Sequence, residues 1–185
     1  AKGRHDQGLV FIGNLTKEKG LEIILESLKQ FPDLKLTIFG KGPNEQSLKE
    51  LTQKMGIEKQ VHFLGQVSNE EILNKLSNYS AGIALYKAEE SYVYYSDPLK
   101  VKEYLAAGLP IIISDVPEIG ELLVNKKAGI IIKNKEDISK ALAIINQHKT
   151  AMSTAAMDLA KEYDWVKIFD RAINQTETKQ ILNKG

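Results

Sequence analysis

The 185-residue chain contains no cysteine, which excludes disulfides and thiolate metal sites. Long apolar runs are also missing, because none approaches the roughly 20 residues of a membrane-spanning helix. The polar first residues, AKGRHDQG, lack the pattern of a signal peptide. We therefore expect a cytoplasmic protein, and a location at the inner face of the membrane, reached through another part of the protein, stays open as an alternative.

An excess of charge of either sign is lacking as well. Lys and Arg number 25 and Asp and Glu number 24, so the formal net charge is +1. Nucleic-acid-binding domains are usually far more basic, so nucleic acid is not an expected partner, whereas a local anion site is compatible with this balance. The chain has no Asp-x-Asp motif, and its three histidines, His5, His62 and His148, are far apart in sequence. We therefore predict no metal site and no Ser-His-Asp triad, and we expect His62 in the core.

Short apolar runs alternate with amphipathic segments along most of the chain. The pattern predicts strands over residues 8–14, 34–39, 61–64, 81–85, 110–114 and 129–132, and helices over residues 19–30, 44–55, 69–76, 97–107, 118–124 and 136–182. Unalternating strands separated by helices are typical of a parallel sheet covered on both faces. With right-handed crossovers, the expected fold is α/β, a Rossmann-like doubly wound sheet of about six strands.

The predicted organisation has three parts. Residues 1–7 read as the remnant of a linker, residues 8–170 as the Rossmann-like domain, and residues 171–185 as the end of a helical tail. We expect this tail to fold back over one face of the sheet. Ligands of such sheets bind outside the carboxyl ends of the strands, so the loops that follow the strands are the candidate site.

The loop after the first predicted strand, GNLTKEKG, combines flexible glycines with lysines. Gly13 lets the backbone approach a ligand, Asn14 follows it, and Lys19 is expected at the start of the first helix. A cation beside the positive end of a helix suits a phosphate. A plain lysine-rich surface loop is the alternative.

The loop after the second predicted strand, GKGPNE, resembles a dinucleotide-binding fingerprint only superficially. It follows the second strand rather than the first, and Glu45 stands where the third glycine is expected. NAD binding is therefore not predicted. Gly40 and Gly42 keep this loop small, either so that a flat ligand can pass over it or because the turn itself is tight.

The stretch YYSDPLKVKEYLAAGLP, residues 94–110, predicts a capped helix with an unusual charge. Ser96 or Asp97 can cap it, and Pro98 suits its first position. Lys100 falls in the first turn, where the helix dipole disfavours a cation by up to about 1 kcal/mol unless an anion neutralises it. Glu103 follows at i+3, and its carboxylate suits vicinal hydroxyls such as those of a ribose. A solvated Lys–Glu pair is the alternative interpretation.

Five segments in order, GNLTKEKG, IFGKGP, VHFLGQVSNEEI, SDPLKVKEYLAAGLPIIISDVPEIGELL and AGIII, together resemble a known family. They are similar to the C-terminal, donor-nucleotide-binding domain of GT-B glycosyltransferases of family 4, a retaining group that uses nucleotide sugars. The resemblance covers roughly residues 8–170, and residues 96–110 are its most specific part.

The resemblance implies roles for individual residues. Lys19 would contact the diphosphate, the backbone at Gln66 and Val67 would hold the base, and Glu103 would bind the ribose hydroxyls. The amides of Leu99 and Lys100 would face the diphosphate. The predicted nucleotide-sugar-binding residues are Gly13, Asn14, Lys19, Gly40, Gly42, Gln66, Val67, Ser96, Leu99, Lys100 and Glu103; no catalytic residue is assigned. The donor would be UDP- or GDP-linked, with no metal and no other cofactor.

Two positions depart from the family pattern. Asn14 stands where an arginine is common, and Tyr95 stands where a second glutamate often pairs with Glu103. Lys100 could supply the charge that Asn14 does not. The family's enzymes also have two Rossmann-like domains, so this chain would be the donor half, and the missing N-terminal half would hold a glycan or lipid-linked acceptor.

We therefore expect the isolated chain to bind a nucleoside diphosphate weakly and to transfer no sugar. Two alternatives of the same fold remain open. One is a non-catalytic nucleotide-sugar-binding or regulatory module, which the departures at Asn14 and Tyr95 favour. The other is a sugar-nucleotide epimerase-like domain, for which no matching set of catalytic residues is evident.

Overall fold

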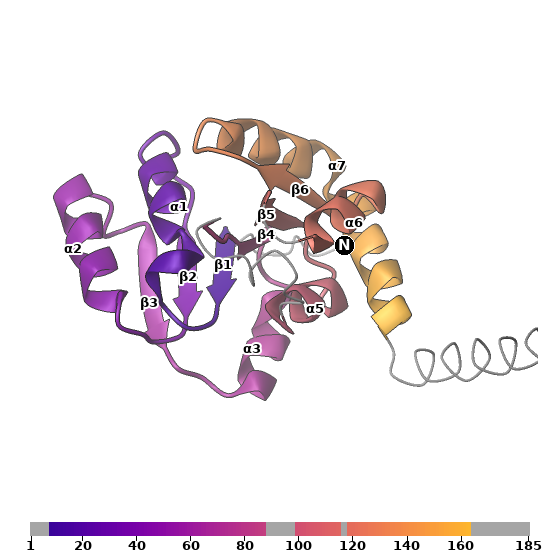
Figure 1. Ribbon diagram of the computed structural model, residues 1–185, viewed down its shortest axis with the longest axis horizontal. Helices are drawn as coiled ribbons and strands as arrows, with labels where there is room; N and C mark the ends of the chain where they lie inside the picture. Colours follow the sequence, from indigo (N-terminus) through magenta and orange to yellow (C-terminus); the bar gives the residue numbers. More distant parts are fainter. Residues whose placement is uncertain (1–7, 88–98, 116–117, 164–185) are drawn as a thin grey trace, which may run out of the picture.

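The computed structural model describes residues 8–87, 99–115 and 118–163. Its centre is a six-stranded parallel sheet in the order β3-β2-β1-β4-β5-β6 (Figure 1). The strands are β1 (Leu9–Ile12), β2 (Leu36–Phe39), β3 (Val61–Gly65), β4 (Ala81–Ala84), β5 (Ile111–Ser114) and β6 (Gly129–Ile132). This is the doubly wound Rossmann order, and it confirms the predicted fold class and number of strands.

Helices cover both faces of the sheet (Figure 1). The side chains of β1 alternate, so that Leu9 and Phe11 belong to one apolar cluster and Val10 to the other. The described helices are η1 (Lys17–Lys19), α1 (Leu21–Leu28), α2 (Glu45–Met55), α3 (Asn69–Leu76), α5 (Leu99–Ala106), α6 (Ile119–Asn125), α7 (Asp137–Ala160) and η2 (Lys161–Tyr163). The first cluster includes residues of α1 and α2, and the second includes residues of α3, α5 and α6.

The long helix α7 passes from one face of the sheet to the other. Ile138 and Ile145, in its first half, pack in the cluster with α1, whereas Ala156 and Leu159, near its end, pack in the cluster with α5. His148 has non-helical backbone angles (φ −117°, ψ 17°), and this kink lies between the two halves. The expectation that the helical tail covers one face was therefore wrong for the part that the structure describes.

Strand β3 lies at one edge of the sheet, and this position explains a second correction. Its burial alternates, with Val61 buried and His62 and Leu64 exposed. A strand at the edge of a sheet can leave one face open to solvent. His62 is thus exposed rather than part of the core.

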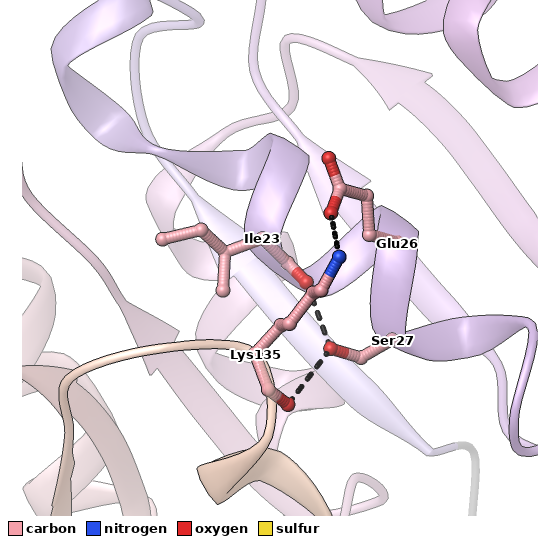
Figure 2. A network of polar contacts seen from close by, with 4 residues as sticks. All are labelled: Ile23, Glu26, Ser27 and Lys135. Atoms are coloured by element: carbon pink, nitrogen blue, oxygen red, sulfur yellow. Dashed lines mark hydrogen bonds and ion pairs between the residues drawn. The ribbon is translucent and has the colours of Figure 1, made fainter.

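A polar network ties α1 to the loop before α7 (Figure 2). The Ser27 hydroxyl donates to the Ile23 carbonyl at 2.8 Å and lies 3.4 Å from the Lys135 carbonyl. The Lys135 ammonium pairs with Glu26 at 3.0 Å, and this hydrogen bond raises the pKa of Lys135. The network joins two segments that flank the same apolar cluster, far from each other in sequence.

Strands β1 and β4 separate at the middle of the sheet. Their pairing comprises Leu9 with Ala81 and Val10 with Gly82, whereas β1 continues beside β2 as far as Ile12. Open α/β sheets bind ligands in the crevice at such a topological switch point.

Among the described helices, none has the length and apolar character needed to cross a membrane.

Candidate functional site

A pocket of about 340 Å³ opens at the carboxyl ends of β1, β2 and β3. Five residues that the sequence predicted for nucleotide binding line it together. They are Gly13, Asn14, Gly40, Gln66 and Val67, and the remaining lining residues are Ile12, Phe39, Lys41 and Ile72. Loops from three strands thus meet at one place, as the topology of the sheet predicts.

Gly40 and Gly42, in the loop after β2, allow the backbone of this loop to approach the backbone of the loop after β1 closely. A Cβ on Gly40, whose φ is +145°, would stand 1.9 Å from the Gly13 carbonyl oxygen, and one on Gly42 would stand 2.4 Å from the Leu15 carbonyl oxygen. Hydrogen bonds join the two loops, from Gly13 N–H to Phe39 and from Leu15 N–H to Lys41, both at 2.9 Å. The small size of this loop therefore fixes the wall of the pocket, and Gly42 itself is not among the lining residues.

Lys100, in the first described turn of α5, extends over β1. Its Nζ lies 4.0 Å from the centre of the Phe11 ring and 3.2 Å from the position of a Cβ on Gly13. The ammonium is buried and has no hydrogen-bond partner within the described part of the chain. Burial, reinforced by the charge of Lys19 and opposed by that of Glu103, lowers the pKa of Lys100 to about 7. The alternative of a solvated Lys–Glu pair does not fit this buried ammonium.

Lys19 reaches the same place from the loop after β1. It closes the 3-10 turn η1, and Gly20, in the left-handed conformation (φ 57°), separates it from α1. The prediction that Lys19 starts the first helix was therefore wrong, because α1 begins at Leu21, after the turn η1. Its Nζ lies 4.7 Å from the centre of the Tyr86 ring, and the Nζ of Lys100 lies 5.5 Å from that same centre.

The two lysines therefore approach one buried aromatic ring, Lys19 from the turn η1 after β1 and Lys100 from the start of α5. An aromatic face attracts cations by about 0.5–2 kcal/mol, which helps to hold both ammonium groups near each other despite their repulsion. Burial raises the pKa of Tyr86, so its hydroxyl stays protonated and supplies no negative charge. The cluster has surplus positive charge at the switch point, beside the pocket.

Glu103 lies one turn after Lys100 on α5 and is half-buried. Burial raises the pKa of its carboxyl, and the positive charge of Lys100 opposes this effect. Leu99 is 66% exposed at the described start of α5. Ser96 and Tyr95 lie outside the described residues. The expected roles of Leu99 and Glu103 stay predictions.

The sequence profile of the family described as glycosyl transferases group 1 matches residues 3–156, which is most of the chain. The chain belongs to this family. The group 1 domain is 27% identical over 175 residues to an uncharacterised glycosyltransferase of Methanocaldococcus jannaschii, and this match covers 90% of the chain and 43% of the relative. The chain thus spans less than half the length of that relative.

Two solved structures show how this group 1 domain relates to larger proteins. The pneumococcal O-GlcNAc transferase, in complex with UDP and GlcNAc, superposes with a TM-score of 0.73 at 21% identity, covering 96% of this chain and 37% of that one. The C-terminal domain of a group 1 glycosyl transferase of Francisella tularensis superposes with a TM-score of 0.68 at 19% identity. This match covers 88% of this chain and 93% of that one. The predicted architecture, the C-terminal half of a GT-B fold, is thereby confirmed.

Phe11, Tyr86 and Lys41 take part in the site of the group 1 domain, but none was predicted as a nucleotide-binding residue. Lys41 and Tyr86 lie in the loops after strands that the sequence indicated as the candidate site, whereas Phe11 lies outside them. Phe11 reads as an ordinary core residue of β1, and Tyr86 is one of several tyrosines near the end of β4. The place of Tyr86 directly after a predicted strand puts it in a candidate loop, but nothing in the sequence gives this tyrosine a role of its own. Aromatic contacts to lysines have no fixed spacing in sequence, so the partners emerge only from the fold.

A second cavity of the group 1 domain, of about 1030 Å³, lies at the amino ends of the strands, opposite the first pocket. Its lining includes Gly8, Lys35 and Ser80, which directly precede β1, β2 and β4. None of the predicted site residues borders it. Across residues 8–87, 99–115 and 118–163, no group of three or more His, Asp or Glu side chains is placed to hold a metal ion.

Proposed function

We propose that this chain is the donor-binding half of a retaining glycosyltransferase. The donor would be a UDP- or GDP-linked sugar, and the acceptor, a glycan or a lipid-linked molecule, would be held by a second half that precedes this one. The larger size of the relatives and the similarity to a separately crystallised C-terminal domain support the division into halves. On this proposal the chain alone binds the nucleotide but transfers no sugar.

The observation that carries the proposal is the contact between the pocket and the lysine cluster. Gly13 lines the pocket, and the buried ammonium of Lys100 lies directly beside it. A pocket of about 340 Å³ falls within the range of small-ligand sites, and we assign the nucleoside to it. The diphosphate would then extend toward Lys100 and Lys19, whose surplus positive charge it neutralises.

The same arrangement suits the chemistry of the transfer. When the bond between the sugar and the diphosphate breaks, negative charge builds up on the departing phosphate oxygens. Ammonium groups fixed in a site of low dielectric stabilise that charge more strongly than water does. Lys100 and Lys19 would therefore act as the cradle of the leaving group, and Glu103 would accept hydrogen bonds from the ribose hydroxyls.

Lysine substitutions test this proposal. UDP, GDP and ADP are titrated into the chain by calorimetry, and the nucleotide that binds is then measured with K100M, K19M and K17M. Lys17 is exposed on the same 3-10 turn and serves as the matched control. A hydrogen bond to a charged group contributes about 1.5–3 kcal/mol, so K100M and K19M are each expected to weaken binding at least tenfold, and K17M by less than threefold.

Two results would contradict the proposal in different ways. If none of the three nucleotides binds the parent chain, the assignment as a donor half fails. If K19M weakens binding and K100M leaves it unchanged, the site remains but the role of Lys100 is wrong. Retained thermal stability in each variant shows that the loss of affinity comes from the missing charge.

A further inference from the structure

Tyr104 is a fully buried side chain of α5 whose hydroxyl reaches into the sheet. The hydroxyl accepts a hydrogen bond from the Ile12 N–H at 2.9 Å. It also lies 3.3 Å from the Val10 carbonyl and 3.3 Å from the Ile83 carbonyl, so its single proton can be donated to either oxygen. One side chain thus connects a helix with both strands of the central pair.

This contact lies where the pairing of β1 with β4 ends. In a regular parallel ladder with Val10 opposite Gly82, the next hydrogen bond would run from the Ile12 N–H to the Ile83 carbonyl. The Tyr104 hydroxyl stands between these two groups and bonds to both sides. It therefore takes the place of the next bond of the ladder and keeps both backbone groups satisfied while the strands separate.

The strand below the ring is shaped to receive it. A Cβ on Gly82 would stand 2.4–2.7 Å from three atoms of the Tyr104 ring, a distance that no side chain tolerates without displacing the ring. Burial also raises the pKa of Tyr104, so the hydroxyl remains a donor as well as an acceptor at any ordinary pH. Gly82 and Tyr104 form an interlock between β4 and α5.

The interlock is adjacent to the proposed donor site on both sides. Tyr104 follows Glu103 directly and lies four residues after Lys100, on the same side of α5. Its partner Ile12 precedes Gly13, the residue that both lines the pocket and lies against the Lys100 ammonium. Any shift of the Tyr104 hydroxyl would therefore move Lys100 and the wall of the pocket relative to each other.

We propose that Tyr104 is a positioning residue of the donor site, whose hydroxyl keeps β1 and β4 apart at the crevice and thereby aligns Lys100 and Glu103 of α5 with it. The donor-binding part of this statement rests on the proposed function. The alignment of α5 with β1 is a property of the fold and can be tested without a nucleotide. Without the hydroxyl, the Ile12 N–H and the Ile83 carbonyl can pair directly, which closes the crevice.

The test removes the hydroxyl and retains the ring, in the 185-residue chain. Y104F is compared with the parent and with Y79F, since Tyr79 is a buried tyrosine of the same apolar cluster. Two quantities are measured: the affinity for UDP, GDP and ADP, and the titration of Lys100 followed by ¹³C NMR of its side chain, assigned with K100M. For Y104F we expect at least fivefold weaker diphosphate binding and a Lys100 titration shifted by at least half a pH unit. Y79F should change neither.

A second variant, G82A, separates the effect of the position of the Tyr104 ring from the effect of losing its hydroxyl. G82A keeps Tyr104 intact but displaces its ring, so it is expected to shift the Lys100 titration as well. An unchanged Lys100 titration in Y104F overturns the proposal, even if the melting temperature falls, and so does unchanged affinity where the parent binds. If the parent binds none of the nucleotides, the proposed function fails, and the Lys100 titration still decides the role of Tyr104.

Discussion

Lys100 is the residue whose surroundings differ most from those of an ordinary lysine. Its ammonium is buried beside Phe11, Tyr86 and another lysine, and it has no hydrogen-bond partner among the described residues. Its folded-state pKa, about 7, is below the ordinary value of 10.5, so the unfolded chain binds more protons between these two pH values. Lys100 therefore weakens the fold at and below pH 7, and this cost fades as the pH rises toward 10.5.

The lowered pKa predicts that a bound diphosphate draws a proton onto Lys100. The terminal phosphate of a nucleoside diphosphate is already ionised at pH 8, because such groups have a pKa of about 6. Its negative charge favours the ammonium and raises the pKa of Lys100. At pH 8 we expect binding to take up close to one proton. At pH 6 Lys100 is already largely protonated and the half-protonated phosphate releases part of its proton on binding, so no net uptake is expected. Calorimetry in buffers of different ionisation enthalpy measures this number directly.

The control for proton uptake is again K17M, which removes an exposed lysine from the neighbouring turn and should take up the same number of protons as the parent. K100M should bind, where binding is still measurable, without proton uptake. Tight binding by the parent at pH 8 with no exchange of protons would contradict the prediction, because Lys100 would then keep one protonation state with and without the ligand.

At the scale of elements, the sequence predicted most of the framework and fewer of the contacts. Six apolar runs predicted six strands because buried parallel strands need continuous hydrophobic residues, and five of the predicted site residues, from the loops after β1, β2 and β3, line one pocket. The exposure of His62 could not be predicted, because only the order of the strands reveals that β3 is at an edge. The interlock of Tyr104 with Gly82 was equally hidden, since it joins residues of α5 and β4 that no periodicity relates.

The crossing of α7 between the two faces shows a further limit. Its apolar residues fit a helix in either location, and the kink at His148, which lets the helix change faces, has no proline or glycine to mark it. The predicted helix is confirmed over Asp137–Ala160, and its continuation beyond residue 163 lies outside the described residues. The surface that it covers depends on how much of each face the other helices leave open. Packing of this kind is decided by the whole molecule rather than by a local pattern.

The close approach of the loops after β1 and β2 predicts a strong effect of one methyl group. In G40A the new Cβ would stand 1.9 Å from the Gly13 carbonyl, at a φ of +145°. In the control G56A the backbone is also unfavourable, with φ +69°, but no atom lies within 4 Å of the new Cβ. We expect G56A to lose about 1–2 kcal/mol of unfolding free energy and G40A roughly 2–5 kcal/mol, from backbone strain together with overpacking.

Urea denaturation measures both glycine variants, and nucleotide binding separates their effects on the site. The wall of the pocket contains Gly40 and Gly13, so G40A should also weaken nucleotide binding, whereas G56A should not. Equal stability losses in the two variants would mean that the loops can move apart freely, and the pocket would then not depend on their contact.

At the scale of the whole molecule, the proposed site lies at the carboxyl ends of the strands and provides groups for the donor alone. The pocket, the lysine cluster and the start of α5 all lie at the carboxyl ends of the strands. On the proposed function these groups hold a nucleotide and its diphosphate, and no residue of the chain is assigned to an acceptor. Because the chain spans 43% of its relative from Methanocaldococcus jannaschii, a second half has room to supply the acceptor side.

This division leads to a prediction about activity. The 185-residue chain should bind its nucleoside diphosphate and should release no free sugar or transfer product from UDP- or GDP-linked donors, because positioning of the acceptor contributes as much as about 7–11 kcal/mol to such a reaction. A protein that joins this chain to the half preceding it in the complete reading frame should transfer sugar, and K100M in that protein should lose activity. Product formation is followed by mass spectrometry with labelled donors. Steady turnover by the 185-residue chain would place the acceptor site within it, and binding without turnover in the longer protein would favour a non-catalytic module of the same fold.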